Sequence, residues 1–210
     1  MKKHKFFLSV VFCILSAVLL WGCGGGTGSP GSQGCEEVGL SCEAAITPIY
    51  LDQDTSDVDV VQDMCDGEKP EDFTAHSAKV AITLSLLNPN TQLPPGTVYI
   101  QKYTVEFSPD KDSEKAPPIE SYSRKITVTV PPPSGTGKTT VTFTADFITE
   151  MQKIQYIKDM LSGEYNSNQF NYYTVTYILE GVARPGDEKI RIIATKNFSI
   201  GNYDNCSGGN

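Results

Sequence analysis

Apolar residues recur at every second position in several segments of this chain, and this period constrains the fold more than any other feature. The clearest example is the apolar set Ala78, Val80, Ile82, Leu84 and Leu86. The same alternation occupies residues 98–107, 126–130, 141–147, 173–179 and 190–200. A period of two is typical of a β-strand with one buried face. The pattern therefore predicts an all-β protein.

Turn residues separate the expected strands and narrow the fold class further. Proline and glycine gather in three of the intervening segments: residues 88–96, 131–135 and 184–187. Within residues 98–107 the apolar set shifts after Ile100, which predicts a bulge near Gln101. With a first strand at residues 58–62, the chain has about seven short antiparallel strands, the pattern of a β-sandwich.

One helix is expected between the strands at residues 141–147 and 173–179. Thr149 and Gln152 have the spacing of a capping box, and Gly163 is a suitable helix end. Four apolar residues follow at helical spacing: Met151, Ile154, Ile157 and Leu161. Such a stripe ordinarily packs on a core, so we expect the helix to close one end of the sandwich. The alternative is a face that binds a partner.

The last expected hairpin resembles the closing F and G strands of bacterial immunoglobulin-like domains. The resemblance is carried by the stretches YTVTYILEG and IRIIATKNFSI, and the general pattern extends over residues 58–200. It implies an immunoglobulin-like sandwich over residues 49–206, with the helix between strands E and F. In such a fold the first and last strands can run parallel, so the segments that follow them leave at the same end.

The start of the chain has the pattern of a secretory signal. Lys2, Lys3 and Lys5 precede an apolar run over residues 6–21 that is shorter than the about 20 residues of a membrane-spanning helix. The run ends in Leu-Trp-Gly-Cys, which resembles the lipobox of bacterial lipoproteins. The resemblance implies a diacylglycerol thioether on Cys23, cleavage before it, and acylation, for instance with palmitate, of the new amino terminus.

Lipidation would place the mature protein on a membrane of the cell envelope. Gly24 is not the aspartate associated with inner-membrane retention, which favours the outer membrane and the periplasm. Residues 24–34 are almost all Gly, Ser, Thr, Pro and Gln, a composition typical of a flexible linker. We therefore expect a signal peptide at residues 1–22, a lipidated tether at 23–48 and one domain at 49–206.

The charge balance excludes some partners. The chain has 17 lysines and arginines and 25 acids; removing the signal takes away three lysines and no acid, so the formal charge changes from −8 to −11. Nucleic-acid binding requires concentrated positive charge, so we expect no nucleic-acid partner. Because the mature chain is acidic, we expect the lipid, and not electrostatic attraction, to hold the protein on the membrane.

Four cysteines follow Cys23, and export makes disulfides their expected state: Cys35, Cys42, Cys65 and Cys206. Four thiols allow three pairings, which sequence alone does not decide. The spacing lacks the close pairs of a zinc site. If the first and last strands run parallel, Cys65 and Cys206 lie near each other. This favours a Cys65–Cys206 disulfide, with Cys35–Cys42 as a local loop in the tether.

An acidic segment raises the alternative of a calcium site formed by Asp52, Asp54 and Asp57. An EF-hand loop that begins at Asp52 would have Asp57 where glycine is needed and Asp63 where glutamate is expected. A solvated acidic segment is the preferred interpretation. A looser calcium site remains an alternative, and we expect no other cofactor.

Catalytic motifs are not evident, so we expect a non-enzyme. His76 precedes a strand and is interpreted as a surface residue. A pocket that brings two carboxylates to His76 would favour the alternative of an envelope hydrolase. Tyr173 and Tyr177 fall on a core face, whereas Tyr165 and Tyr172 remain candidates for a carbohydrate surface. The preferred function is binding or assembly in the envelope with a protein partner; carbohydrate or calcium binding is the alternative.

Overall fold

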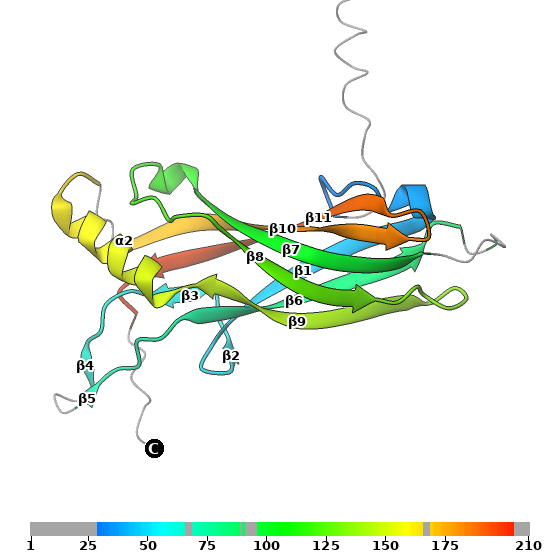
Figure 1. The fold of residues 1–210 in the computed structure, drawn as a ribbon. Helices are drawn as coiled ribbons and strands as arrows, with labels where there is room; N and C mark the ends of the chain where they lie inside the picture. The colour runs from blue at the N-terminus through cyan, green and yellow to red at the C-terminus, as the bar shows by residue number, and fades with distance from the viewer. Residues whose placement is uncertain (1–28, 66–68, 89, 91–95, 166–168, 204–210) are drawn as a thin grey trace, which may run out of the picture.

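Two β-sheets pack face to face in the computed structural model of the chain, and the α-helix of the described residues lies at one end (Figure 1). The structure describes residues 29–65, 69–88, 90, 96–165 and 169–203. The expected all-β sandwich is confirmed. The described residues form eleven strands, more than the seven expected, because several very short strands lie between the long ones.

The first sheet has the order β2-β1-β6-β9. Its strands are β1 (Leu40–Tyr50), β2 (Gln53–Asp54), β6 (His76–Leu86) and β9 (Lys138–Ile148). The second sheet has the order β3-β11-β10-β7-β8. Its strands are β3 (Asp57–Asp59), β7 (Thr97–Pro109), β8 (Tyr122–Val130), β10 (Phe170–Arg184) and β11 (Glu188–Gly201). A small separate pair consists of β4 (Met64–Cys65) and β5 (Lys69–Pro70).

The topology is that of an immunoglobulin-like sandwich. Neighbours β1, β6 and β9 correspond to strands A, B and E, and β11, β10 and β7 correspond to G, F and C. The short strand β3 pairs in parallel with the end of β11. The helix α2 (Glu150–Ser162) connects β9 to β10, which is the predicted position.

The period-two pattern buries one face of each long strand between the sheets. Ala78, Val80, Ile82 and Leu84 of β6 are fully buried, and so are Tyr173 and Tyr177 of β10. The register between β7 and β8 shifts between Ile100 and Lys102, so the expected bulge at Gln101 is confirmed.

The sandwich begins earlier than expected. Strand β1 starts at Leu40, so the predicted domain boundary at residue 49 lies inside a strand, and residues 58–62 do not form the first strand. The buried positions of β1 alternate through Leu40, Cys42 and Ile46. Small residues within this segment weaken its apolar alternation. Pro48 also argues against a strand, because proline has no N–H to donate to the hydrogen bonds of a sheet.

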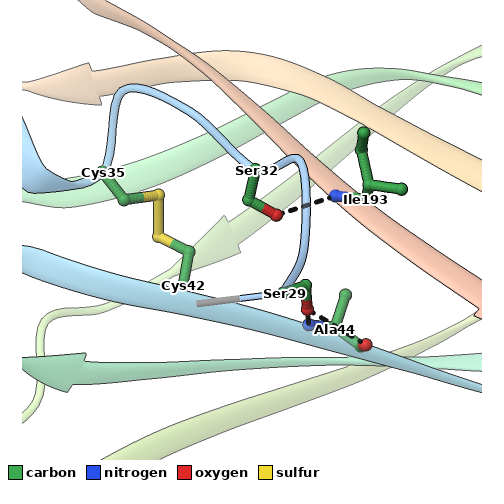
Figure 2. The surroundings of a disulfide bond; sticks show 6 residues. All are labelled: Ser29, Ser32, Cys35, Cys42, Ala44 and Ile193. Atoms are coloured by element: carbon green, nitrogen blue, oxygen red, sulfur yellow. Dashed lines mark hydrogen bonds between the residues drawn. A yellow bond between two sulfur atoms is a disulfide. The ribbon is translucent and has the colours of Figure 1, made fainter. Parts of the chain in front are cut away.

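Residues 29–39, predicted to be tether, lie against the edges of both sheets (Figure 2). The hydroxyl of Ser29 accepts the Ala44 N–H of β1 at 2.8 Å, and the hydroxyl of Ser32 accepts the Ile193 N–H of β11 at 3.0 Å. Gln33 and Arg191 exchange two backbone hydrogen bonds. We call residues 29–35 the N-terminal clasp, because this segment bonds to both β1 and β11, which belong to different sheets and share no strand pairing. A short 3₁₀ turn, η2 (Glu36–Val38), follows it.

A disulfide joins Cys35 to Cys42 and fixes the clasp to β1, so this pairing is confirmed (Figure 2). Both cysteines are buried in the core rather than placed in a tether. The Cys65–Cys206 pairing falls outside the described side chains, as do the signal segment and Cys23. Among the helices of the described residues, none has both the length and the apolar character needed to span a bilayer.

Candidate functional site at the helical end

Helix α2 begins and ends as the sequence predicts. The hydroxyl of Thr149 accepts the Gln152 N–H at 3.3 Å, and the Gln152 side-chain oxygen accepts the Thr149 N–H at 2.9 Å. This reciprocal pair completes the capping box. Gly163 ends the helix in the left-handed conformation, with a φ of 77°.

The orientation of α2 differs from the prediction. Three of the four stripe residues face solvent: Met151 is 71% exposed, Ile154 39% and Leu161 81%. The helix instead buries Lys153 and Tyr156. Tyr156 fits the interior because its hydroxyl accepts a hydrogen bond from the Asn171 amide at 2.8 Å. Only Ile157 of the stripe packs against the core, so the expectation that the whole stripe does so is wrong.

A groove of about 350 Å³ lies beside the first half of α2. Its lining residues come from the helix and from the segment before β8: Pro118, Ile119, Glu120, Met151, Gln152, Gln155 and Asp159. The side chain of Gln152 donates to the Glu120 carbonyl at 2.7 Å and holds the two walls together. Gln155 donates to the Asp159 carboxylate at 2.8 Å. The groove thus combines an apolar floor with two carboxylates.

Beneath α2, Lys153 enters a buried cluster of charged and aromatic side chains. Its Nζ lies 5.0 Å from the centre of the Tyr50 ring and 4.7 Å from that of Phe73. Both distances fit a cation–π contact. Burial lowers the pKa of Lys153 to about 8, although the charges of Asp59 and other nearby acids act in the opposite direction.

Asp59 and Glu71 supply the negative charges of this cluster. Asp59 Oδ1 accepts the N–H groups of Val61 and Tyr203 at 3.3 and 2.9 Å, so it ties β3 to the segment after β11. Burial raises the pKa of Asp59 to about 6, against the effect of these two bonds. Glu71 accepts the Asp63 N–H at 2.8 Å. No motif in the sequence marks Glu71 as a site residue, and Asp59 is one of several acids in the segment considered for calcium.

His76 is buried, not at the surface as predicted. It is 1% exposed, because it occupies the first inward position of β6. Its ring stacks on Tyr50 with 4.2 Å between ring centres. Burial, and next the charge of Lys153, lower the pKa of His76 to about 3. The imidazole is therefore neutral at physiological pH, and neither ring nitrogen has a hydrogen-bond partner among the described residues.

The structure therefore brings two carboxylates into the same buried end as His76, which is part of the arrangement expected of a hydrolase. Asp59, Glu71, His76 and Lys153 are all buried, however. The cluster lies beneath α2, whereas the groove beside α2 is open to solvent.

The other candidate residues lie apart from this end or do not converge. Asp54 pairs with Lys79 at 3.3 Å, Asp57 accepts the Ser199 hydroxyl at 2.8 Å, and Asp52 is exposed in the turn after β1. Over the described residues, no group of three potential ligands is placed to hold a metal ion. Of the tyrosines proposed for carbohydrate contact, Tyr172 is half-exposed and Tyr165 partly buried.

Comparison with known proteins adds little to this picture. No family model and no curated protein matches the chain. A solved structure of a Northeast Structural Genomics Consortium target matches 78% of this chain and 87% of its own at 10% identity, with a TM-score of 0.33. A protein from Archaeoglobus fulgidus matches 62% of this chain and 87% of its own at 11% identity, with a TM-score of 0.35. Likeness of this degree establishes neither a shared fold nor a shared function.

Proposed function

We propose that this protein is a lipid-anchored, non-catalytic protein of the bacterial cell envelope that holds a protein partner at its helical end. One observation carries the binding role: α2 exposes Met151, Ile154 and Leu161 while it buries a lysine. Exposing large apolar side chains on one helix costs free energy unless a partner covers them, so such patches commonly mark interaction sites. The acidic charge of the chain is consistent with a protein partner rather than a nucleic acid.

The two ends of the sandwich suit these two roles. Leu40 of β1 pairs with Leu86 of β6 at one end, whereas Ile49 pairs with Ser77 toward the other. The clasp joins the sandwich near Leu40, and α2 follows Ile148 at the opposite end (Figure 1). A lipid on Cys23 would lead to Ser29, which is bonded to Ala44 near the middle of β1, so the attachment would lie away from α2 and leave the helix free for a partner.

The binding role is tested by photo-crosslinking in native membranes. A photoreactive amino acid replaces Met151 or Leu161, and Thr142, exposed on the outer face of β9, provides the control position. We expect a discrete protein adduct from both helix positions and none from the control. The absence of an adduct from α2, or the same adduct from all three positions, would contradict the proposal.

The anchor has a separate test. Cells fed a labelled fatty acid should transfer the label to the full-length protein, and the Cys23→Ser variant should remain unlabelled. Cys35→Ser serves as the control, because Cys35 is in a disulfide and its loss should not affect labelling. Label on the Cys23→Ser protein would refute lipidation at this residue.

A further inference from the structure

The lining of the groove beside α2 indicates what kind of protein segment would bind there. Pro118, Ile119 and Met151 form its apolar surface, and Met151 is 71% exposed. Methionine has an unbranched, polarisable side chain that adapts to different partners. This part of the groove therefore suits an aliphatic or aromatic side chain.

The charged residues of the groove all have the same sign. Glu120 and Asp159 are its only charged lining residues, and both carry carboxylates. The two glutamines are already engaged as donors, Gln152 to the Glu120 carbonyl and Gln155 to Asp159. The groove thus offers a partner mainly acceptors and negative charge. Lys158, the exposed lysine of α2, is not among the lining residues.

We infer that this groove binds a protein segment in which an apolar side chain is flanked by lysine or arginine. The inference rests on the proposed function, since it names the partner chemistry of the same surface. Charge complementarity carries it: cations beside the apolar anchor would meet Glu120 and Asp159, whereas an acidic segment would meet two carboxylates on a strongly acidic protein. The neighbouring Ile154 and Leu161 extend the apolar contact along the helix.

The test uses the full-length protein purified in detergent and three short synthetic peptides. The peptides share one leucine face and differ only in the flanking residues, which are lysine, glutamine or glutamate. Binding is measured by fluorescence anisotropy at low and moderate ionic strength. We expect the lysine peptide to bind best, and to lose affinity as salt increases because exposed charges are screened.

Variants locate the effect. The double variant Glu120→Gln, Asp159→Asn should bind the lysine peptide with an affinity roughly three- to ten-fold lower, the loss expected for two solvent-exposed charge pairs. The matched control, Glu43→Gln with Glu106→Gln, removes the same charge at exposed positions elsewhere and should leave affinity unchanged. Glu120→Lys with Asp159→Lys should reverse the preference, so that the glutamate peptide binds best.

The outcomes separate this inference from the proposed function. If the glutamate or glutamine peptide binds as well as the lysine peptide, or if the control pair weakens binding equally, the partner chemistry is wrong. The same holds if none of the peptides binds. Crosslinks from Met151 in native membranes would then still support a partner at α2, whereas their absence would contradict both proposals.

Discussion

Lys153, Asp59 and His76 show how single residues at the helical end depend on their surroundings. Each is buried, and burial is the largest cause of the pKa shift of each. The charge of Lys153 faces the rings of Tyr50 and Phe73, whose electron-rich faces attract a cation. His76 stays neutral because burial, and next the charge of Lys153, lower its pKa. The cluster therefore links the stability of this end to pH.

His76 should make the protein sensitive to acid. Its pKa is about 3 in the folded protein against an ordinary 6.5, so its contribution to stability is complete above pH 6.5 and is lost as the pH falls toward 3. In His76→Phe, the free energy of unfolding should depend less on pH in this range, with a slope smaller by up to about 1.4 kcal/mol per pH unit. Urea unfolding followed by circular dichroism between pH 7 and pH 4 measures this. An unchanged slope would show that His76 is not the sensitive group.

Lys153 should hold down the pKa of Asp59. In Lys153→Met the cation is lost, so the pKa of Asp59 should rise above its present value of about 6. A raised folded pKa means that stability present at acid pH is lost as the pH rises through that pKa. Relative to the wild type, the variant should therefore lose more of its melting temperature at pH 8 than at pH 5. Adding Asp59→Asn should remove this dependence; if the double variant retains it, another group is responsible.

Helix α2 shows that one element can serve the core and a surface with different faces. Its inner face, Lys153 and Tyr156, packs on the sandwich, and its outer face carries the exposed apolar residues. The capping box at Thr149 fixes where the helix begins, and Gly163 where it ends. The helix is thus held in place by its ends and its inner face, which leaves the outer face available for binding.

The two faces of α2 should respond differently to substitution. Tyr156→Ala removes a buried ring and a hydrogen bond, so we expect it to cost about 3 kcal/mol or more of unfolding free energy. Leu161→Ser changes an exposed residue and should cost less than about 0.5 kcal/mol. Chemical denaturation of both variants tests this. A large loss in Leu161→Ser would show that the stripe packs on the protein after all.

The capping box should account for a measurable part of the helix stability. Thr149→Ala removes the acceptor for the Gln152 N–H and should destabilise the protein by about 1 kcal/mol. Thr149→Ser keeps the hydroxyl and should be close to wild type. Hydrogen exchange of the first turn of α2 reports the effect locally, and equal exchange in both variants would argue against the cap.

At the scale of the whole molecule, the clasp determines how far the domain can lie from a membrane. If Cys23 carries the lipid, only residues 24–28 separate it from Ser29, which is bonded to β1. A fully extended chain of that length reaches about 20 Å. The 26-residue tether expected from the sequence, residues 23–48, would have reached several times farther. The disulfide from Cys35 to Cys42 holds the clasp on β1 and so keeps the connection between Cys23 and the domain short.

Removing the disulfide should lengthen this connection. The Cys35→Ser, Cys42→Ser double variant should lose about 2–3 kcal/mol by the chain-entropy model, and release of residues 29–39 would extend the reach to about 60 Å. A fluorescent amino acid at Lys138, near the clasped end, should transfer less energy to dye-labelled lipids in this variant than in the wild type. Equal transfer would mean that the hydrogen bonds of the clasp suffice without the disulfide.

The sequence by itself determined the local structure, because local structure depends on the period of apolar residues and on cap and turn chemistry. The six long strands from β6 to β11, the bulge at Gln101 and the ends of α2 were predictable. The Cys35–Cys42 pair was favoured only through the expected fold, in which parallel first and last strands would bring Cys65 near Cys206 and leave this pair as a local loop. Strand β1 was missed because its small residues and Pro48 weaken the alternation.

The tertiary structure alone decided what the helical end contains. Asp59, Glu71, His76 and Lys153 come from four separate segments, and no local pattern links them. Helical spacing identifies two possible faces of α2 but not which one the sandwich receives; that depends on Tyr50, Phe73 and Asn171 beneath it. Burial is a property of the packed chain, so the neutral His76 and the exposed apolar stripe become evident only when the sheets and the helix are together.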